Sequence, residues 1–383
     1  MTQPLQGIRI LDLTRLLPGP FITQLLADMG AEVIKVETPI AGDYARLTPP
    51  EMGLGGLFEM INQGKKSISI NYRNPRGRDV FLKLVATADV IIESFRPSAA
   101  ERMKIDFETL RVIKPDLIYC ALSGYGQNGP MSKRAGHDLN YSALSGALSL
   151  NALEGGAPHV YGLTVADLSG AMLAGISILG AIIGRQERGE GAFLDVALLD
   201  GILSWMMPMA GAAFFSGIPV TGGTLPLQGG LACYNVYETA DGKYISLGAL
   251  EPAFWGDFCK VTGRNDLLPR QFDRAIKDEV AAIFKGQTLA NWLEAFSGSD
   301  GCVEPVLSFE EALAHPQVRA RGFVRMDKGR PVGLNSPFAY GSAEARPVPG
   351  LGAHTHEVLG EILSAEELDE LSQSGVIGKR AAN

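Results

Sequence analysis

The feature that most constrains the fold is a regular alternation of strand-like and helix-like segments over the first 125 residues. "IRILDLT" (8–14) and "AEVIKVE" (31–37) are short apolar runs of the strand type, and "FITQLLADM" (21–29) has helical apolar spacing. Gly30 is a natural helix stop, and Pro20 suits a first helical turn. Further strand patterns lie at 66–72, 89–94 and 117–124, with a helical one at 77–88. The alternation predicts an α/β fold with a parallel sheet and helices on its faces.

The pattern changes after about residue 225. Two alternating strands fill 234–250 and are joined by Asp241-Gly242, a strong hairpin signal, and helical stretches follow at 251–262 and 288–298. The tail at 354–377 is an amphipathic helical pattern, which we expect to pack on the first domain. We therefore predict four parts, which are a large α/β domain (1–200), a linker (201–225), a smaller α+β domain (226–325) and a return segment (326–383).

Composition narrows the class of protein and its partners. The chain has 383 residues and a net charge of −8, which argues against nucleic acid or an anionic membrane as the main partner. Its four cysteines are far apart and form no CxxC, as in a reducing cytoplasm. The first residues lack the pattern of a secretory signal. The longest apolar run, about 170–184, is shorter than the ~20 residues of a membrane span and predicts a buried helix. We expect a cytoplasmic enzyme.

One motif is misleading. "GYGQNG" (124–129) matches G-x-G-x-x-G after a strand, but Pro130 follows it, and no hydrophobic helix opens there. The first β–α–β unit, where a dinucleotide fingerprint belongs, has "TRLLPGP" instead. We therefore expect no NAD or FAD site, and we interpret these glycines as allowing a loop to pass close to something bulky.

Three acidic or basic positions could carry chemistry. His137 precedes Asp138 in a glycine-flanked loop, and histidine titrates nearest to neutral pH; the alternative is that Asp138 caps a helix beginning there and His137 is an exposed neighbour. Asp167 stands just before an apolar, buried helix, where a carboxylate is usually a cap but can also be catalytic. Glu251 follows a strand and precedes Pro252, and it is either solvated or lines a cleft.

Basic residues gather in two segments. They could be solvated surface or a patch that binds phosphates. The first segment supplies Lys65, Lys66, Arg73, Arg76 and Arg78, and the second supplies Arg96, Arg102 and Lys104. No spacing of a zinc site, a P-loop or a G-x-S-x-G elbow occurs, so we expect no metal.

Several of these segments, in order, resemble one family. "GIRILDLTRLLPGPFITQLLADMGAEVIKVE", "NQGKKSISIN", "ADVIIESFRP", "LIYCALSGYGQNGP" and "GEGAFLDVALLDG" are similar to family III CoA-transferases and alpha-methylacyl-CoA racemases. The resemblance covers nearly the whole chain. It implies a Rossmann-like large domain without a dinucleotide, a smaller domain and an interlocked homodimer. It also implies coenzyme A as part of the substrate, with no other cofactor.

The resemblance also implies roles for particular residues. In racemases the position of Asp167 is an acid/base paired with a histidine in a motif that is intact here as Gly136-His137-Asp138-Leu139-Asn140-Tyr141, and Asp167 follows His137 by 30 positions. "GALEP" is racemase-like and gives Glu251 a site role, supported by Asp138. "WMMPM" resembles a methionine-rich surface for acyl chains, although a core role is an equal alternative. Residues expected to bind CoA are Lys65, Lys66, Arg73, Phe95, Arg96, Arg102, Gly136 and Tyr141, and those of the acyl surface are Met206, Met207 and Met209.

Two chemistries share this scaffold. A racemase removes the α-proton of a 2-methylacyl-CoA through His137 and returns a proton from Asp167 to the opposite face, with the enolate oxygen held by backbone N–H groups, which we expect at the helix start near Asp167. A transferase uses Asp167 as a nucleophile. The sequence "DLSGAM" after Asp167 is closer to the transferase style, whereas the His137 motif favours the racemase. We predict a racemase, with CoA transfer as the alternative and a non-catalytic CoA-binding protein as a third possibility.

Overall fold

The chain forms two compact units. The structure is a computed structural model that describes residues 3–49, 56–338 and 346–378. The first unit comprises 1–144, 163–205 and 319–383, and the second comprises 145–162 and 206–318. Residues 145–162, which the sequence analysis placed in the large domain, thus group with the second unit.

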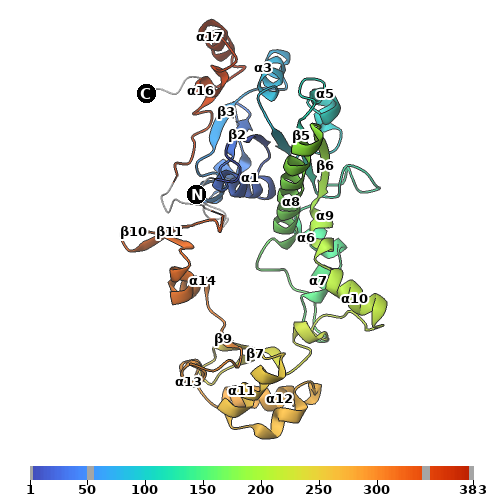
Figure 1. The fold of residues 1–383 in the computed structure, drawn as a ribbon, viewed down its shortest axis with the longest axis vertical. Coiled ribbons are helices and arrows are strands. Elements are labelled where there is room, and N and C mark those ends of the chain that lie inside the picture. Colours follow the sequence, from blue (N-terminus) through green and yellow to red (C-terminus); the bar gives the residue numbers. More distant parts are fainter. Residues whose placement is uncertain (1–2, 50–55, 339–345, 379–383) are drawn as a thin grey trace. The chain divides into compact units, whose positions relative to one another are not determined.

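The first unit is built on a six-stranded parallel sheet, which confirms the predicted α/β class (Figure 1). The strand order is β3-β2-β1-β4-β5-β6. The strands are β1 (Arg9–Leu13), β2 (Glu32–Glu37), β3 (Lys66–Ser69), β4 (Val90–Glu93), β5 (Ile118–Ser123) and β6 (Ala192–Ala197). Every residue of β4 and β5 is buried, as expected for central strands covered on both faces. The order reverses between β1 and β4, and α/β sheets bind ligands at the carboxyl ends of the strands beside such a switch point.

Two helices that start at this carboxyl edge pack closely against each other. Helix α1 (Pro18–Asp28) follows β1, and α8 (Val165–Arg188) precedes β6. Small residues allow the contact, because a Cβ atom on Gly175 of α8 would lie only 2.4 Å from Ile22 Cδ1 of α1. Likewise a Cβ on Gly201 of α9 (Leu198–Ser204) would lie 2.5 Å from the backbone N of Gly170.

Helix α8 is long and apolar enough to cross a membrane by length and composition alone. Half of its most apolar window is buried, and the helix contacts α1, α9, β5 and β6. Its contacts agree with the predicted buried helix, although Ile176 and Ile183 remain exposed. Helices α9 and α10 (Met207–Phe215) taken together pass the same test of length and composition.

The C-terminal tail packs on the core of the first unit. Helices α16 (Thr355–Leu359) and α17 (Ala365–Gln373) contribute Val358, Leu359, Leu368 and Leu371 to the cluster around β1–β3 and α3 (Pro75–Val85). Other elements of this unit are α2 (Leu57–Ile61), α4 (Ala99–Met103), α5 (Phe107–Leu110), α6 (Asp138–Leu144), a 3-10 turn (Tyr44–Leu47) and the hairpin β10–β11 (Val324–Asp327, Arg330–Leu334).

The second unit has an antiparallel sheet of β7 (Tyr234–Glu238), β8 (Tyr244–Gly248) and β9 (Val303–Pro305). The turn between β7 and β8 contains Gly242 with φ +73°, which confirms the predicted hairpin. Trp255, Phe258, Phe284 and Trp292 form an aromatic core between this sheet and its helices. Its helices are α7 (Ala147–Leu150), α10, α11 (Pro252–Thr262), α12 (Lys277–Lys285), α13 (Leu289–Ala295) and α14 (Phe309–Ala314), and α15 (Pro316–Ala320) spans its boundary with the first unit.

Candidate active site at the carboxyl edge of the sheet

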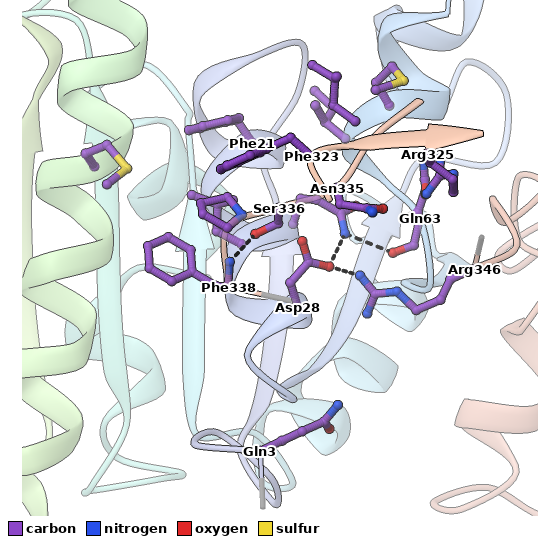
Figure 2. Close-up of a pocket in the computed structure, with 17 residues that line it drawn as sticks. Gln3, Phe21, Asp28, Gln63, Phe323, Arg325, Asn335, Ser336, Phe338 and Arg346 are labelled. Carbon is purple, nitrogen blue, oxygen red and sulfur yellow. Dashed lines mark hydrogen bonds and ion pairs between the residues drawn. The ribbon is translucent and has the colours of Figure 1, made fainter. Parts of the chain in front are cut away.

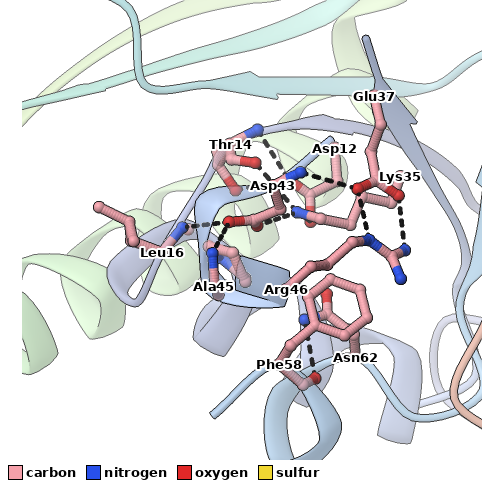
Figure 3. Close-up of polar contacts among 12 residues, drawn as sticks. Asp12, Thr14, Leu16, Lys35, Glu37, Asp43, Ala45, Arg46, Phe58 and Asn62 are labelled. Carbon is pink, nitrogen blue, oxygen red and sulfur yellow. Dashed lines mark hydrogen bonds and ion pairs between the residues drawn. The ribbon is translucent and has the colours of Figure 1, made fainter. Parts of the chain in front are cut away.

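A buried ion network fixes the loop between β1 and α1 (Figure 3). Lys35 Nζ lies 2.8 Å from Asp43 Oδ2 and donates to the carbonyl of Thr14 at 3.0 Å. Asp43 Oδ1 accepts from the backbone N of Leu16 at 3.0 Å, and Leu16 has φ +64°. A positive φ is costly for leucine, so these contacts hold the loop in a conformation that it would not adopt alone.

A second ion pair braces the same network from β2. Arg46 binds Glu37 with both nitrogens of its fork, at 2.8 and 2.7 Å, and its guanidinium lies 3.7 Å from the centre of the Phe58 ring. Glu37 Oε1 also accepts from the backbone N of Asp43. Such bidentate pairs are geometrically specific, so they orient Asp43 for its contact with Leu16.

Lys65 belongs to this interior network. Its ammonium is fully buried and contacts Asp12 Oδ2 at 3.4 Å, Thr23 Oγ1 at 2.8 Å, Asn62 Oδ1 at 2.9 Å and the carbonyl of Pro20 at 2.9 Å. Burial lowers the pKa of Lys65 to about 7. Burial alone would raise the pKa of Asp12, but Lys35 and Lys65 together lower it to about 2. The structure therefore gives Lys65 internal partners in place of the predicted CoA phosphate.

The side chain of Lys66 has different partners, toward the amino edge of the sheet. It begins β3 and forms ion pairs with Glu32, which begins β2, and with Glu357 of the tail. Glu32 stands at the amino end of β2, so this ion pair draws the ammonium of Lys66 away from the loops that follow β1 and β4. Two adjacent lysines that the sequence grouped with the basic patch thus have different structural roles.

Three other predicted CoA-binding cations are exposed. Arg73 follows β3, Arg96 follows β4 and Arg102 lies in α4. Between them, the ring of Phe95 packs against that of Tyr72 at a centroid distance of 6.2 Å. Arg73 and Arg96 thus follow the carboxyl ends of their strands, and α/β sheets bind ligands at that edge.

Arg15, in the loop between β1 and α1, was not among the site residues predicted from the sequence. Its guanidinium lies 5.0 Å from the centre of the exposed ring of Tyr44. Its positive charge also opposes the effect of burial on the pKa of Tyr72, so it acts on the segment after β3. Its position directly after a buried strand was the signal available in the sequence.

His137 and Asp138 begin α6, next to the start of α8. Thr164, the residue before α8, makes no side-chain cap. Asp138 Oδ1 takes that place and accepts from the backbone N atoms of Ala166 at 2.7 Å and Asp167 at 3.0 Å. Asp138 is therefore a helix cap, as the simpler interpretation held, but it caps a helix that begins 27 residues later. The contact brings the His137 loop to the turn that carries Asp167.

Asp167 is the third residue of α8 and is partly buried. Burial, and then the neighbouring charge of Asp138, raise the pKa of Asp167 to about 7. Near neutral pH both its acid and its base forms are therefore populated, which suits a group that alternately gives and takes a proton. His137 is exposed, so its imidazole is accessible.

Gly136 and Tyr141 shape the loop that presents His137. The hydroxyl of Tyr141 donates to the carbonyl of Gly136 at 2.6 Å, and the ring of Tyr141 meets that of Tyr125 edge to face at 5.0 Å. A Cβ on residue 136 would lie 2.7 Å from the hydroxyl oxygen of Tyr125, so only glycine fits. Asn140 closes the turn, because its Oδ1 accepts from the backbone N of His137 at 3.0 Å.

The backbone donors expected to hold an enolate oxygen are already engaged. The N–H groups of Ala166 and Asp167 donate to Asp138, and that of Leu168 donates to Thr164. The expectation of an oxyanion site at this helix start is therefore wrong for these three amides. Helix α1 also begins at this carboxyl edge of the sheet.

Glu251 and the three methionines lie in or next to the second unit. Glu251 is the exposed residue before α11, and Met207 is 71% exposed in α10. Met209 Sδ accepts from Gln228 Nε2 at 3.6 Å, and Met206 directly precedes α10. No residue of α10 is buried, so the core role is not seen for these methionines. Their predicted roles toward His137 and Asp167 stay predictions.

A cavity of about 540 Å³ lies elsewhere in the first unit (Figure 2). Phe21 and Leu25 of α1, Met172 of α8, and Phe323 and Phe338 of the C-terminal segment supply much of its apolar wall. An ion pair between Asp28 and Arg346 lies at its polar side. None of the predicted site residues lines it. Among the residues that the structure describes, no group of three or more His, Cys, Asp or Glu side chains could hold a metal.

Comparison with known proteins identifies the family. The sequence profile of CoA-transferase family III matches residues 5–355. Succinyl-CoA:glutarate CoA-transferase of Mus musculus is 34% identical over 98% of this chain and 90% of its own length. Alpha-methylacyl-CoA racemase of Homo sapiens is also 34% identical, over 97% of both chains. The crystal structure of a CAIB/BAIF family protein from Brucella suis superposes with a TM-score of 0.80 at 29% identity, over 94% of this chain and 100% of that one. The chain therefore belongs to CoA-transferase family III and is an enzyme that acts on CoA thioesters.

Proposed function

We propose that the protein is a racemase that interconverts the (R) and (S) forms of 2-methylacyl-CoA thioesters. The observation that carries the proposal is the contact of Asp138 with the first turn of α8, which brings the loop of an accessible His137 to an Asp167 whose pKa is about 7. Racemisation needs two groups that can each donate and accept a proton on opposite faces of one carbon.

In this mechanism His137 removes the α-proton of one enantiomer, and the acid form of Asp167 protonates the opposite face of the enolate. The roles reverse for the other enantiomer. Neither residue forms a bond to the substrate. Arg73, Arg96 and Arg102 bind the CoA phosphates, and Glu251 is a further residue of the catalytic set that we propose. The enolate oxygen needs donors other than the amides of residues 166–168, which have partners already.

The test is the fate of one enantiomer. Incubation of (S)-2-methylacyl-CoA with the enzyme should give an equal mixture of the two forms, resolved by chiral chromatography after hydrolysis. The variant Asp167→Asn keeps the volume of the side chain but holds no exchangeable acid proton, so it should leave the enantiomer unchanged. Full racemisation by Asp167→Asn would overturn the proposal.

CoA transfer through Asp167 is the second candidate. The equal similarity to a glutarate CoA-transferase and to a racemase favours keeping it. A transferase forms an aspartyl thioester or anhydride, which hydroxylamine traps. Inactivation by hydroxylamine that depends on acyl-CoA, with the added mass on Asp167, would establish transfer. A racemase should be indifferent to the reagent.

We further propose that the enzyme works as a homodimer in the cytoplasm and needs no cofactor beyond CoA in its substrate. Two exposed apolar surfaces support association. Helix α10 exposes Phe214 at 79% and Phe215 at 90%, and α8 exposes Ile176 and Ile183 at 65% and 64%. Exposed apolar side chains gathered in this way mark interaction surfaces. Sedimentation equilibrium should give twice the mass of one chain, and a monomer at micromolar concentration would contradict the dimer.

A further inference from the structure

The carboxyl end of β4 holds an acid that the mechanism above does not use. Glu93 is the last residue of β4 and is 3% exposed. It lies beside the switch point, directly before the loop that carries Phe95 and Arg96. Its carboxyl accepts a hydrogen bond from the backbone N of Phe95 at 2.5 Å. Among the residues that the structure describes, no basic side chain forms an ion pair with Glu93, which is unusual for a buried carboxylate.

Burial without a partner cation indicates the protonation state of Glu93. A carboxylate that is removed from water and not paired with a cation is costly, and such a group takes up a proton instead. The neutral acid still has an acceptor oxygen for the Phe95 amide. The neighbouring hydroxyl of Tyr119 donates its proton to the carbonyl of Ile105 at 3.2 Å.

The surroundings agree with the neutral form. Burial raises the pKa of Glu93 to about 8, against the opposing effect of the Phe95 amide. The titratable groups that share its environment are Tyr72 after β3 and Tyr119 and Cys120 on β5. Burial raises the pKa of each of them, so they stay neutral up to pH 9. From the β1 side, the positive charge of Arg15 acts on Tyr72.

We propose that Glu93, as a neutral carboxylic acid, is a positioning residue that holds the loop of Phe95 and Arg96 in its acyl-CoA-binding conformation. The inference rests on the proposed binding of CoA at this edge. The bond to the Phe95 amide fixes the backbone next to Arg96, and Phe95 passes the constraint on through its ring contact with Tyr72. Loss of the proton places a buried negative charge behind a site for phosphates.

The proposal predicts that the affinity for acyl-CoA changes with pH through the titration of Glu93. If only the protonated form binds, the competent fraction falls to about one tenth at pH 9, so the dissociation constant rises about tenfold between pH 7 and pH 9. The probe is a CoA thioether, which has no free thiol to titrate and cannot react, and binding is measured by calorimetry. Its phosphates are about nine-tenths or more ionised throughout this range, because the second pKa of a phosphate monoester is about 6.

Glu93→Gln reproduces the neutral acid, since its amide oxygen can still accept from the backbone N of Phe95. It should fold, bind the thioether at pH 7 as the wild type does, and bind equally well at pH 9. Glu101→Gln removes an exposed carboxylate from α4 nearby and should follow the wild type at both pH values. Glu93→Ala should bind more weakly at every pH. The infrared difference between the wild type and Glu93→Gln should show the carbonyl band of a protonated carboxylic acid at pH 7 that is lost above pH 8.

Two results would overturn the proposal. One is a Glu93→Gln variant with the same pH dependence as the wild type, or one that does not fold. The other is a wild type whose affinity is constant from pH 7 to pH 9. A wild type that fails to bind the thioether even at pH 7 would instead refute CoA binding at this edge. In that case the infrared band still decides whether Glu93 is protonated.

Discussion

Removing the side chain that caps α8 should damage both the fold and the chemistry, and two variants separate the effects. In Asp138→Ala, the backbone N–H groups of Ala166 and Asp167 lose their acceptor, at 2.7 and 3.0 Å in the protein. Thr164 supplies no replacement cap. Loss of a side-chain cap costs up to about 2 kcal/mol, and this one serves two amides, so we expect a loss of about 2 kcal/mol in the free energy of unfolding.

Asp138→Asn keeps the acceptor oxygen and removes only the charge. Its free energy of unfolding should stay within about 0.5 kcal/mol of the wild type, since a neutral Asn caps helices nearly as well as Asp. The pKa of Asp167, about 7 in the protein, should fall, because a like charge beside it is gone. It should not reach its ordinary value, because burial is the larger cause of the shift and is unchanged.

The sign of the pH effect follows from the role of Asp167. In the direction in which Asp167 acts as the acid, activity is present below its pKa and is lost as the pH rises through about 7. That loss should occur at lower pH in Asp138→Asn. Urea unfolding and pH–rate profiles of α-proton exchange measure the two effects. An Asp138→Ala variant as stable as the wild type, or an Asp138→Asn variant with an unshifted profile, would refute this account of the α8 start.

Three further predictions follow from the site and the packing. His137→Ala and Asp167→Ala should each lower α-proton exchange by about 10²–10⁴-fold while a CoA thioether still binds in calorimetry, because each group supplies one proton transfer; exchange at the wild-type rate would contradict the assignment. Arg96→Ala should raise the dissociation constant of the thioether by about tenfold or more through loss of a charged hydrogen bond, and unchanged binding would exclude Arg96 as a phosphate ligand. Gly201→Ala should destabilise the protein by about 1–3 kcal/mol in urea unfolding, because the new Cβ would lie 2.5 Å from the backbone N of Gly170. Gly180→Ala in α8 has open space around the new Cβ and is the matched control, so equal losses in both variants would argue against the close α8–α9 contact.

Local patterns in the sequence were sufficient to predict the sheet but not its order. Apolar runs such as 31–37 and 89–94 identify strands because buried parallel strands are apolar on both faces. Nothing local states that β4 pairs with β1 rather than with β3. That pairing creates the switch point, so the place of the site could not be predicted from strand patterns alone.

The basic residues show why a cluster in sequence is not a cluster in space. Lys65 and Lys66 are neighbours at the start of β3, but Lys65 binds Asp12 and Thr23 in the interior, whereas Lys66 pairs with Glu32 at the amino end of β2. Arg96 follows the other end of a strand and is exposed. Sequence also gave no sign that Lys65 would be buried, since its partners Asp12 and Thr23 come from distant segments.

The His137 motif was visible in the sequence, but the reach of Asp138 was not. A cap normally serves its own helix, and here the carboxylate serves another, so only the tertiary structure shows it. The sequence held one signal for Glu93, because an acidic residue ends an otherwise apolar strand. Its meaning depends on the burial of the carboxyl without a partner cation, which only the tertiary structure shows.

The central claim is that the enzyme moves the α-proton of its substrate. The most direct measurement is proton NMR of a 2-methylacyl-CoA incubated with the wild type in D₂O, with no acceptor acid present. The account predicts that the α-proton signal disappears and that the 2-methyl doublet collapses as deuterium enters from solvent. An α-proton signal that persists, together with CoA transfer once free carboxylic acids are added, would contradict it.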